Sequence, residues 1–365
     1  MNMLDISQNL FCRAQNIRRT EAYQGLLALY GLTQTAVEMR SKRLLDKCIN
    51  ELLLYPDGMP HPHYNFESYR AGGNALAWLL WADKSGQVQL PDDFRARGHK
   101  VLREYAEKTL KAPADKDGIL CHPKAPEKSM VWIDVITAVT PFMVYAGLVL
   151  ECEKYITFGA EQCFKMLDLF HNPENDLFHQ SRGFMSDLNA ISHDHWSRGN
   201  AWGYVGLTDM IRDLPKDSPY RERAEFEFVR LSEALLKVQG TDGMWRQELT
   251  VDSCWTESSG SALFLYGFGA GLRTGLLGEK FKAPFLRGLN ALTSDYITDK
   301  FKTISSCPGC LCPGEGEMKG TIEAYINCKQ PEDDEAHSYG AFMLALVEAH
   351  RCGIVSTEML KEQLK

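Results

Sequence analysis

Residues 193–211 read HDHWSRGNAWGYVGLTDMI, and they join a crowded polar and aromatic start to an apolar segment with helical spacing. From Arg198 onward the segment is poor in charge and rich in glycine, alanine and aromatic residues. A helix that is poor in charge on every side is usually buried on every side. The stretch therefore predicts an inner helix of an all-helical fold, with its polar groups gathered at the first turn.

Five other segments have the same character, and they alternate with amphipathic segments at residues 36–54, 94–111 and 220–239 that are expected to face solvent. The six charge-poor segments begin at Arg19, Tyr69, Ile133, Arg198, Glu257 and Glu335. These starts lie about 50 to 80 residues apart, the length of one helical hairpin and a loop.

The pattern predicts an all-α (α/α)6 barrel of six inner and six outer helices. A helical solenoid is the alternative, although solenoid repeats are usually more regular in length. No linker rich in Pro, Gly and Ser divides the chain, so residues 1–365 are expected to form a single catalytic domain. If the inner helices run parallel, their polar first turns meet at one mouth of the barrel, where free N–H groups and helix dipoles favour anions.

The net charge and the amino-acid composition indicate which partners and which cellular compartment to expect. The net charge of −8 argues against nucleic acid. The sequence contains no run of about 18 apolar residues, so we expect no membrane span. The first 20 residues lack the features of a signal peptide. The eleven cysteines are odd in number and lie mostly in apolar helical text, so we expect reduced thiols and a cytoplasmic protein.

Asp134 is the first candidate for chemistry, because it lies at the start of the otherwise apolar segment SMVWIDVITAVTP, residues 129–141. One interpretation is an acidic residue that stabilises the helix N-terminus. The other is a carboxyl group beside Trp132, partly desolvated, whose raised pKa suits general acid catalysis.

Arg198, Trp196 and Trp202 form the second candidate group. Arginine presents a planar fork that matches a carboxylate, and tryptophan presents a flat apolar face of the kind that packs on sugar rings. The alternative is two core tryptophans and an arginine that caps a neighbouring helix. His193 and His195 suggest a metal site only weakly, because no third ligand is near them.

Two further polar clusters lie at later helix starts. Glu257 follows Trp245 and Trp255, and it is expected to be either a second acid or a group that orients a neighbour or stabilises the helix N-terminus. His337 lies at the sixth helix start. The segment CPGCLC, with Cys307, Cys310 and Cys312, lacks the second pair of a usual metal site and favours a rim loop. We expect no metal and no cofactor.

Four motifs, in order, resemble the unsaturated glycuronyl hydrolases of glycoside hydrolase families 105 and 88, of which family 105 looks the closer. They are WID (132–134), HWSRGNAW (195–202), DGMWRQEL followed by WTESSGSALFLYGFGAGLR (242–273), and DEAHSYGAF (334–342). The resemblance extends from about residue 65 to about residue 350. It implies an (α/α)6 barrel that removes a 4,5-unsaturated uronic acid from the non-reducing end of oligosaccharides produced by polysaccharide lyases. The reaction is hydration of a vinyl ether.

The resemblance also implies roles for individual residues. Asp134 matches the family's catalytic aspartate, and Trp132, Arg198 and Trp202 match residues of its site. Together with the residue analysis, this gives an expected set of substrate-binding residues: Trp132, His195, Trp196, Arg198, Trp202, Glu257 and His337.

The sequence departs from the family pattern in two places. A second aspartate before the second inner helix is missing, and Glu67, Tyr69 and Asn74 are the candidates to replace it. A histidine found in many members is also displaced, since His179 lies one place early and Gln180 occupies its slot.

Two other functions remain open from the sequence. One is a sugar isomerase or epimerase of the same fold, with His63, His195 or His337 as bases. The other is a sugar-binding module without catalysis. In every case the expected partner is a sugar and not a membrane or nucleic acid, and the protein is expected to be a monomer or a homodimer.

Overall fold

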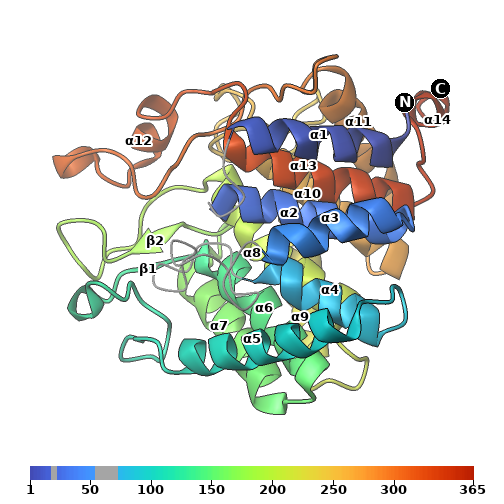
Figure 1. Ribbon diagram of the computed structural model, residues 1–365. Helices are drawn as coiled ribbons and strands as arrows, with labels where there is room; N and C mark the ends of the chain where they lie inside the picture. The colour runs from blue at the N-terminus through green and yellow to red at the C-terminus, as the bar shows by residue number, and fades with distance from the viewer. Residues whose placement is uncertain (18–22, 54–72) are drawn as a thin grey trace.

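The computed structural model describes residues 1–17, 23–53 and 73–365, which form two layers of helices (Figure 1). The inner helices are α2 (Tyr23–Glu38), α4 (Asn74–Lys84), α6 (Val135–Leu150), α8 (Ser197–Asp213), α10 (Ser258–Thr274) and α13 (Ala336–Arg351). Each inner helix packs against the next one along the chain, and α13 packs back against α2, which closes the ring. The predicted (α/α)6 barrel is confirmed.

The outer layer consists of helices that alternate with the inner ones in the chain. They are α1 (Met3–Ile17), α3 (Lys42–Leu53), α5 (Asp92–Leu110), α7 (Glu153–Phe170), α9 (Arg221–Lys237) and α11 (Lys282–Ser294). The remaining elements are short: β1 (Val131–Trp132), β2 (Ser181–Arg182), α12 (Ile322–Asn327), α14 (Thr357–Gln363) and the 3-10 turns η2 (Pro126–Lys128), η3 (Glu279–Phe281) and η4 (Gly316–Met318). Within the described ranges, no helix is both long and apolar enough to cross a membrane.

The predicted helix starts agree closely with the structure wherever it describes them. Those at Ile133, Arg198, Glu257 and Glu335 fall within two residues of the first residues of α6, α8, α10 and α13. The starts predicted at Arg19 and Tyr69 lie outside the described residues.

The predicted outer segment 36–54 was wrong at its beginning. Residues 36–38 are the end of α2, and the chain then turns at Arg40 with a positive φ of 49° before α3 begins at Lys42. A residue in the left-handed region commonly ends a helix, and glycine usually marks the place. Here an arginine occupies it, so no glycine marks the break.

Small residues allow the inner helices to approach one another closely. A Cβ atom added to Gly340 of α13 would lie 2.5 Å from the backbone of Leu27 on α2. A Cβ atom added to Gly267 of α10 would lie 2.0 Å from the ring of Tyr204 on α8. Both distances are too short for any real side chain, so glycine at these positions sets the spacing of the ring.

A buried ionic cluster joins four inner helices, α2, α6, α8 and α10. Arg212 of α8 donates through Nε to Asp213 at 2.8 Å, and its Nη2 atom lies 3.2 Å from Asp209. Tyr30 of α2 and Tyr266 of α10 each donate to Asp209, and Tyr145 of α6 donates to Asp213. We call Tyr30, Tyr145, Asp209, Arg212, Asp213 and Tyr266 the Arg212 cluster. Its cation lies in the last turn of α8, where the helix dipole favours positive charge.

Replacing Arg212 with methionine should lower the free energy of unfolding by about 3–5 kcal/mol, because two buried carboxylates lose their cation. Urea denaturation of the variant and the parent measures this difference. Lys42→Ala is the control, since the Lys42–Asp46 pair is exposed and should contribute less than about 1 kcal/mol. Equal losses in the two variants would contradict a special role for the cluster.

Candidate active site

The first turns of the inner helices meet at one end of the barrel. Each inner helix follows an outer helix in the chain, so all six inner helices run in the same direction. In Figure 1 this end carries β1, β2 and α12, and the chain termini lie at the opposite end. The sequence placed its polar clusters at these helix starts, and the structure brings them to one mouth.

The short β-sheet positions Asp134. Trp132 of β1 pairs with Ser181 of β2, and the N–H of Ile133 donates to the carbonyl of Gln180 at 2.9 Å. This pairing sets Asp134 beside Gln180, whose Nε2 donates to Asp134 Oδ2 at 3.4 Å. Asp134 immediately precedes α6, but its side chain makes no capping hydrogen bond with that helix. The position of Asp134 agrees with an acidic residue that stabilises the helix N-terminus, but no capping hydrogen bond supports that interpretation.

The environment of Asp134 suits a general acid. The residue is half-buried, and burial raises the pKa of its carboxyl to about 7. The nearby Arg198 charge opposes this rise, whereas Asp194 adds to it. A carboxyl group with a pKa near neutrality is partly protonated at working pH, as proton donation requires.

Trp132 is the aromatic neighbour that the sequence placed next to this carboxyl. It is 6% exposed and contacts His122 and Phe184, with ring centroids 5.6 Å and 6.0 Å away. Its indole therefore belongs to the apolar wall from which Asp134 projects.

Asp194 is a second buried carboxyl in the site, and the sequence analysis missed it. Its oxygens accept from the backbone N–H groups of Gln180 at 3.3 Å and Trp196 at 3.0 Å. Burial, followed by the charge of Glu248, raises the pKa of Asp194 to about 6. The signal in the sequence is an aspartate between His193 and His195, beside Trp196 at a helix start.

Gln180 links Asp134 to the cysteine-rich segment 307–312. The Gln180 side chain is fully buried, and its Nε2 also donates to the carbonyl of Cys310 at 2.7 Å. Its Oε1 accepts from the N–H of Cys312 at 3.0 Å and from the hydroxyl of Tyr325 at 2.5 Å. Segment 307–312 is thus a loop over the mouth. Among the described residues, no group of three or more His, Cys, Asp or Glu side chains could hold a metal ion.

Arg198 is buried, and most of its donors bind protein. Nη1 donates to the carbonyl of Cys307 and, at 3.0 Å, to Ser259 Oγ, while Nη2 donates to the carbonyl of Pro308 at 2.8 Å. The guanidinium also lies 4.8 Å from the ring of Trp196. The guanidinium, whose planar fork is expected to bind a substrate carboxylate, therefore binds carbonyl oxygens of the rim loop through both Nη atoms. The Nε of Arg198 is buried and has no partner among the described residues.

Glu257 acts as the cap of α10. Its carboxylate accepts from the N–H groups of Ser259 and Gly260 at 3.0 Å and 2.6 Å, and from the N–H of Cys307 at 3.0 Å. It also lies 3.8 Å from Arg198 Nη1. Of the two roles considered from the sequence, the geometry favours the group that orients neighbours over a second acid.

The two predicted histidines are held by other side chains. His337 Nδ1 lies 2.8 Å from Glu335, and Tyr23 lies within hydrogen-bond distance of Nε2. Burial, followed by the Arg198 charge, lowers the pKa of His337, so the ring is neutral.

His195 points toward the loop after α7. Its Nε2 accepts from the side-chain amides of Asn172 at 2.9 Å and Asn175 at 3.2 Å. Its Nδ1 lies 3.5 Å from Glu248 Oε1. These contacts favour a role of His195 in stabilising the start of α8 over a role in the reaction.

Trp196 and Trp202 are core residues in this structure. Trp196 is 1% exposed and donates from its indole to Gln247 at 3.2 Å, and Trp202 is 6% exposed. Both belong to the main apolar core, so neither presents an open face to a sugar ring. Their predicted substrate contacts remain predictions that this arrangement does not support.

Asn74 is the one described candidate for the missing second aspartate, since Glu67 and Tyr69 lie outside the described residues. Asn74 begins α4, and its Nδ2 donates to the carbonyl of Thr137 at 2.9 Å, one turn beyond Asp134. Its Oδ1 is buried without a partner in the described ranges. Asn74 therefore stays a candidate for this role beside Glu67 and Tyr69.

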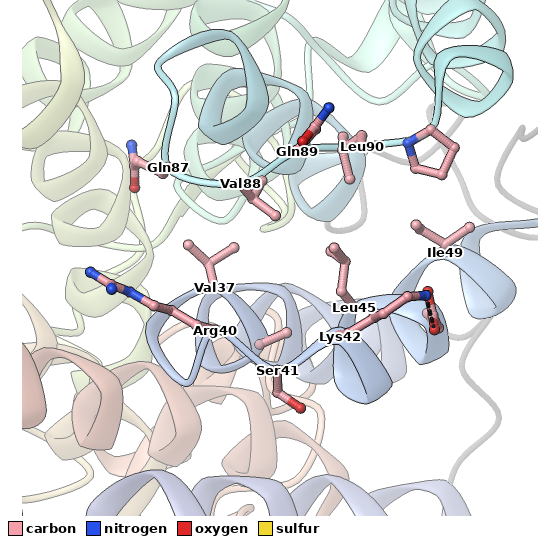
Figure 2. A pocket seen from close by; sticks show the side chains of 13 residues that line it. Val37, Arg40, Ser41, Lys42, Leu45, Ile49, Gln87, Val88, Gln89 and Leu90 are labelled. Carbon is pink, nitrogen blue, oxygen red and sulfur yellow. Dashed lines mark hydrogen bonds and ion pairs between the residues drawn. The ribbon is translucent and has the colours of Figure 1, made fainter.

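A cavity of about 590 Å³ lies at the other end of the barrel, between the turn joining α2 to α3 and residues 87–91 (Figure 2). Its walls are largely apolar, with Val37, Leu45 and Leu90 among them. Lys42 at its edge is paired with Asp46 at 2.9 Å. Because α2 and α4 end here, the cavity is separate from the mouth that holds Asp134.

Comparison with known proteins agrees with this geometry. Residues 90–352 match the sequence model of Glycosyl Hydrolase Family 88. The chain belongs to this family. A family 105 glycoside hydrolase from C. acetobutylicum ATCC 824 superposes with a TM-score of 0.79 at 20% identity, covering 96% of this chain and 100% of that chain. A family 88 hydrolase from Bacteroides vulgatus superposes with a TM-score of 0.69 at 19% identity, over 96% of this chain and 98% of that one.

Curated relatives that match this chain are named as unsaturated 3S-rhamnoglycuronyl or rhamnogalacturonyl hydrolases. The chain is 26% identical over 172 residues to an unsaturated 3S-rhamnoglycuronyl hydrolase of Alteromonas sp. (strain LOR), covering 46% of this chain and 42% of the relative. It is 27% identical over 168 residues to the unsaturated rhamnogalacturonyl hydrolase YesR of Bacillus subtilis (strain 168), covering 45% of this chain and 48% of that relative. The chain thus spans less than half the length of these two relatives.

Glu257→Ala should lower the free energy of unfolding by about 2 kcal/mol, because α10 loses its cap and the buried N–H of Cys307 loses its acceptor. Urea denaturation measures the loss. Ser356→Ala, which removes the cap of the exposed terminal helix α14, is the matched control and should have a smaller effect. A Glu257→Ala protein as stable as the parent would show that the carboxylate is not a structural cap.

Proposed function

We propose that this protein hydrolyses oligosaccharides that carry a 4,5-unsaturated uronic acid at the non-reducing end, by hydration of the vinyl ether. The observation that carries the proposal is Asp134, a carboxyl group with a pKa of about 7 at the mouth of a family 88 barrel. The names of the curated relatives point to the same substrate class.

The chemistry requires a neutral acid near a carbon atom. Asp134 donates its proton to C4, and the C4=C5 π electrons form the new C4–H bond. The positive charge that develops is shared by C5 and the ring oxygen. Water then bonds to C5 and gives a proton to Asp134, which restores the acid. The resulting hemiketal opens and releases the aglycone, so one carboxyl group serves as acid and then as base.

The surrounding groups support this cycle in different ways. The Arg198 charge favours the anion that Asp134 becomes after proton transfer, whereas burial and Asp194 favour the neutral acid before it. Arg198 Nε, which has no partner among the described residues, is the donor that we propose for a substrate carboxylate. Trp132 forms part of the wall beside the acid. The proposed contacts of His195, Trp196, Trp202, Glu257 and His337 have less support, because their contacts hold protein elements together.

The two alternatives are less well supported. An isomerase needs a free histidine base, but His195 and His337 are engaged by neighbouring side chains, and His63 lies outside the described residues. A module without catalysis has no need of a desolvated carboxyl group, which lowers stability at neutral pH.

The proposal also includes a single catalytic domain over residues 1–365 and a monomer or homodimer that needs no metal or cofactor. The single barrel formed by the described residues supports the first part. We also propose a cytoplasmic location, supported by eleven cysteines that are all unpaired.

A panel of oligosaccharides made by different polysaccharide lyases tests the activity, with loss of the ultraviolet absorbance of the conjugated double bond as the readout. The saturated counterparts are the matched control. We expect turnover of at least one unsaturated substrate and of no saturated one. Failure with every lyase product, together with interconversion of free monosaccharides, would favour the isomerase instead.

Asp134→Asn should reduce kcat by about a thousandfold, because an amide cannot donate the proton to C4. The variant should remain folded and, above about pH 7, should be more stable than the parent. The reason is that the folded-state pKa of Asp134 is raised, so the parent loses stability as pH rises from about 4, the pKa of an unfolded aspartate, to about 7. Turnover assays and urea denaturation at two pH values test both statements. Retained turnover would remove Asp134 from the acid role.

The pH dependence of kcat/KM should follow the protonated fraction of Asp134. We expect the rate constant to fall as pH rises above about 7, by about tenfold per pH unit once the carboxyl is ionised. Steady-state kinetics on one unsaturated oligosaccharide between about pH 5 and 9 measure the profile. A rate constant that rises with pH through this range would indicate a general base instead.

A further inference from the structure

The amide of Gln180 has only one possible orientation. The N–H of Cys312 is only a donor, so the Gln180 atom 3.0 Å from it must be the oxygen. The carbonyl of Cys310 is only an acceptor, so the Gln180 atom 2.7 Å from it must be the nitrogen. Turning the amide over would place like groups together at both contacts in a buried site. Gln180 Nε2 therefore faces Asp134 with its second N–H.

This orientation distinguishes the two oxygens of Asp134. In a neutral carboxylic acid one oxygen carries the proton and the other is the better acceptor. Asp134 Oδ2 accepts from Gln180 at 3.4 Å. The proton is then favoured on Oδ1, the oxygen that Gln180 does not contact.

We propose that Gln180 is a positioning residue that keeps the transferable proton of the catalytic acid on Asp134 Oδ1. The inference rests on the proposed function and deepens it. Gln180 donates to Oδ2 before and after proton transfer, so the proton that returns from water is also directed to Oδ1. The chain thereby uses an amide in the slot where many relatives are expected to carry histidine.

Other groups facing Asp134 define what a pH measurement reports. Among the described residues, Arg198 of α8 lowers the pKa of Asp134, and Asp194, which precedes α8, raises it. The hydrogen bond from Gln180 also lowers it, because the donor stabilises the carboxylate. Around the amide itself lie Cys310, Cys312 and Tyr325, which are neutral at working pH because burial raises the pKa of each.

Gln180→Met and Gln180→Glu are the test variants, because both keep about the same length. Methionine removes the donor, and glutamate replaces it with a group that repels the Asp134 carboxylate when ionised. The titration midpoint of Asp134 is read by NMR of protein labelled with ¹³C in the aspartate carboxyls, with the Asp134 signal assigned from its absence in Asp134→Asn. We expect the midpoint to rise in Gln180→Met and to rise further in Gln180→Glu. We also expect kcat to fall about tenfold to hundredfold in Gln180→Met, with KM nearly unchanged.

Gln247→Met is the matched control. Gln247 is also a fully buried amide, and it donates to Cys307 Sγ and to the carbonyl of Tyr325, beside the same loop. If Gln180 only supports the loop, the two methionine variants should lose similar stability and neither should move the Asp134 midpoint. An unchanged midpoint in both Gln180 variants, or an equal shift in Gln247→Met, would overturn the proposal.

Failure of the two proposals can be told apart. If the parent turns over no unsaturated oligosaccharide, the proposed function fails whatever the NMR titration shows. If the parent is active but the Asp134 midpoint is unchanged in both Gln180 variants, only the positioning role fails.

Discussion

Desolvation of the Asp134 carboxyl group is the constraint on which the site depends. A carboxyl group ionises well below neutrality in water, and burial is the main cause that keeps part of Asp134 neutral at working pH. The barrel supplies that environment by bringing the first turns of six buried helices to one mouth and by placing segment 307–312 over it. The site then needs Gln180, Arg198 and Asp194 to set how much of the acid remains protonated.

Buried charged groups have different surroundings at the two ends of the barrel. At the C-terminal end of α8, Arg212 is bonded to carboxylates and tyrosines from four inner helices, so its charge is neutralised and serves stability. At the mouth, Glu257 and Arg198 fix the rim loop through the N–H and carbonyl of Cys307. Asp134 accepts a long hydrogen bond from Gln180 and has a raised pKa, so it remains the reactive group.

The sequence predicted the barrel because charge-poor segments can only be inner helices, and that property is visible residue by residue. It also predicted Asp134, since a charge in apolar text must be either capped or functional. It could not predict the partners of Gln180, because Asp134 lies 46 positions away in the chain and Cys310 and Cys312 lie 130 and 132 positions away. Trp196 and Trp202 were predicted to stack on a sugar because they are tryptophans. A ring can do so only if it is exposed, and exposure depends on tertiary packing. The turn at Arg40 was not predicted either, because a residue other than glycine adopts the left-handed conformation there.

Running the reaction of an unsaturated oligosaccharide in D₂O tests the central claim most directly, because vinyl ether hydration transfers one solvent-derived proton from Asp134 to C4. The account predicts a normal solvent isotope effect on kcat/KM and a single deuterium at C4, in one configuration, in the product. Release of an unsaturated uronic acid with its double bond intact, or a product without deuterium at C4, would contradict it.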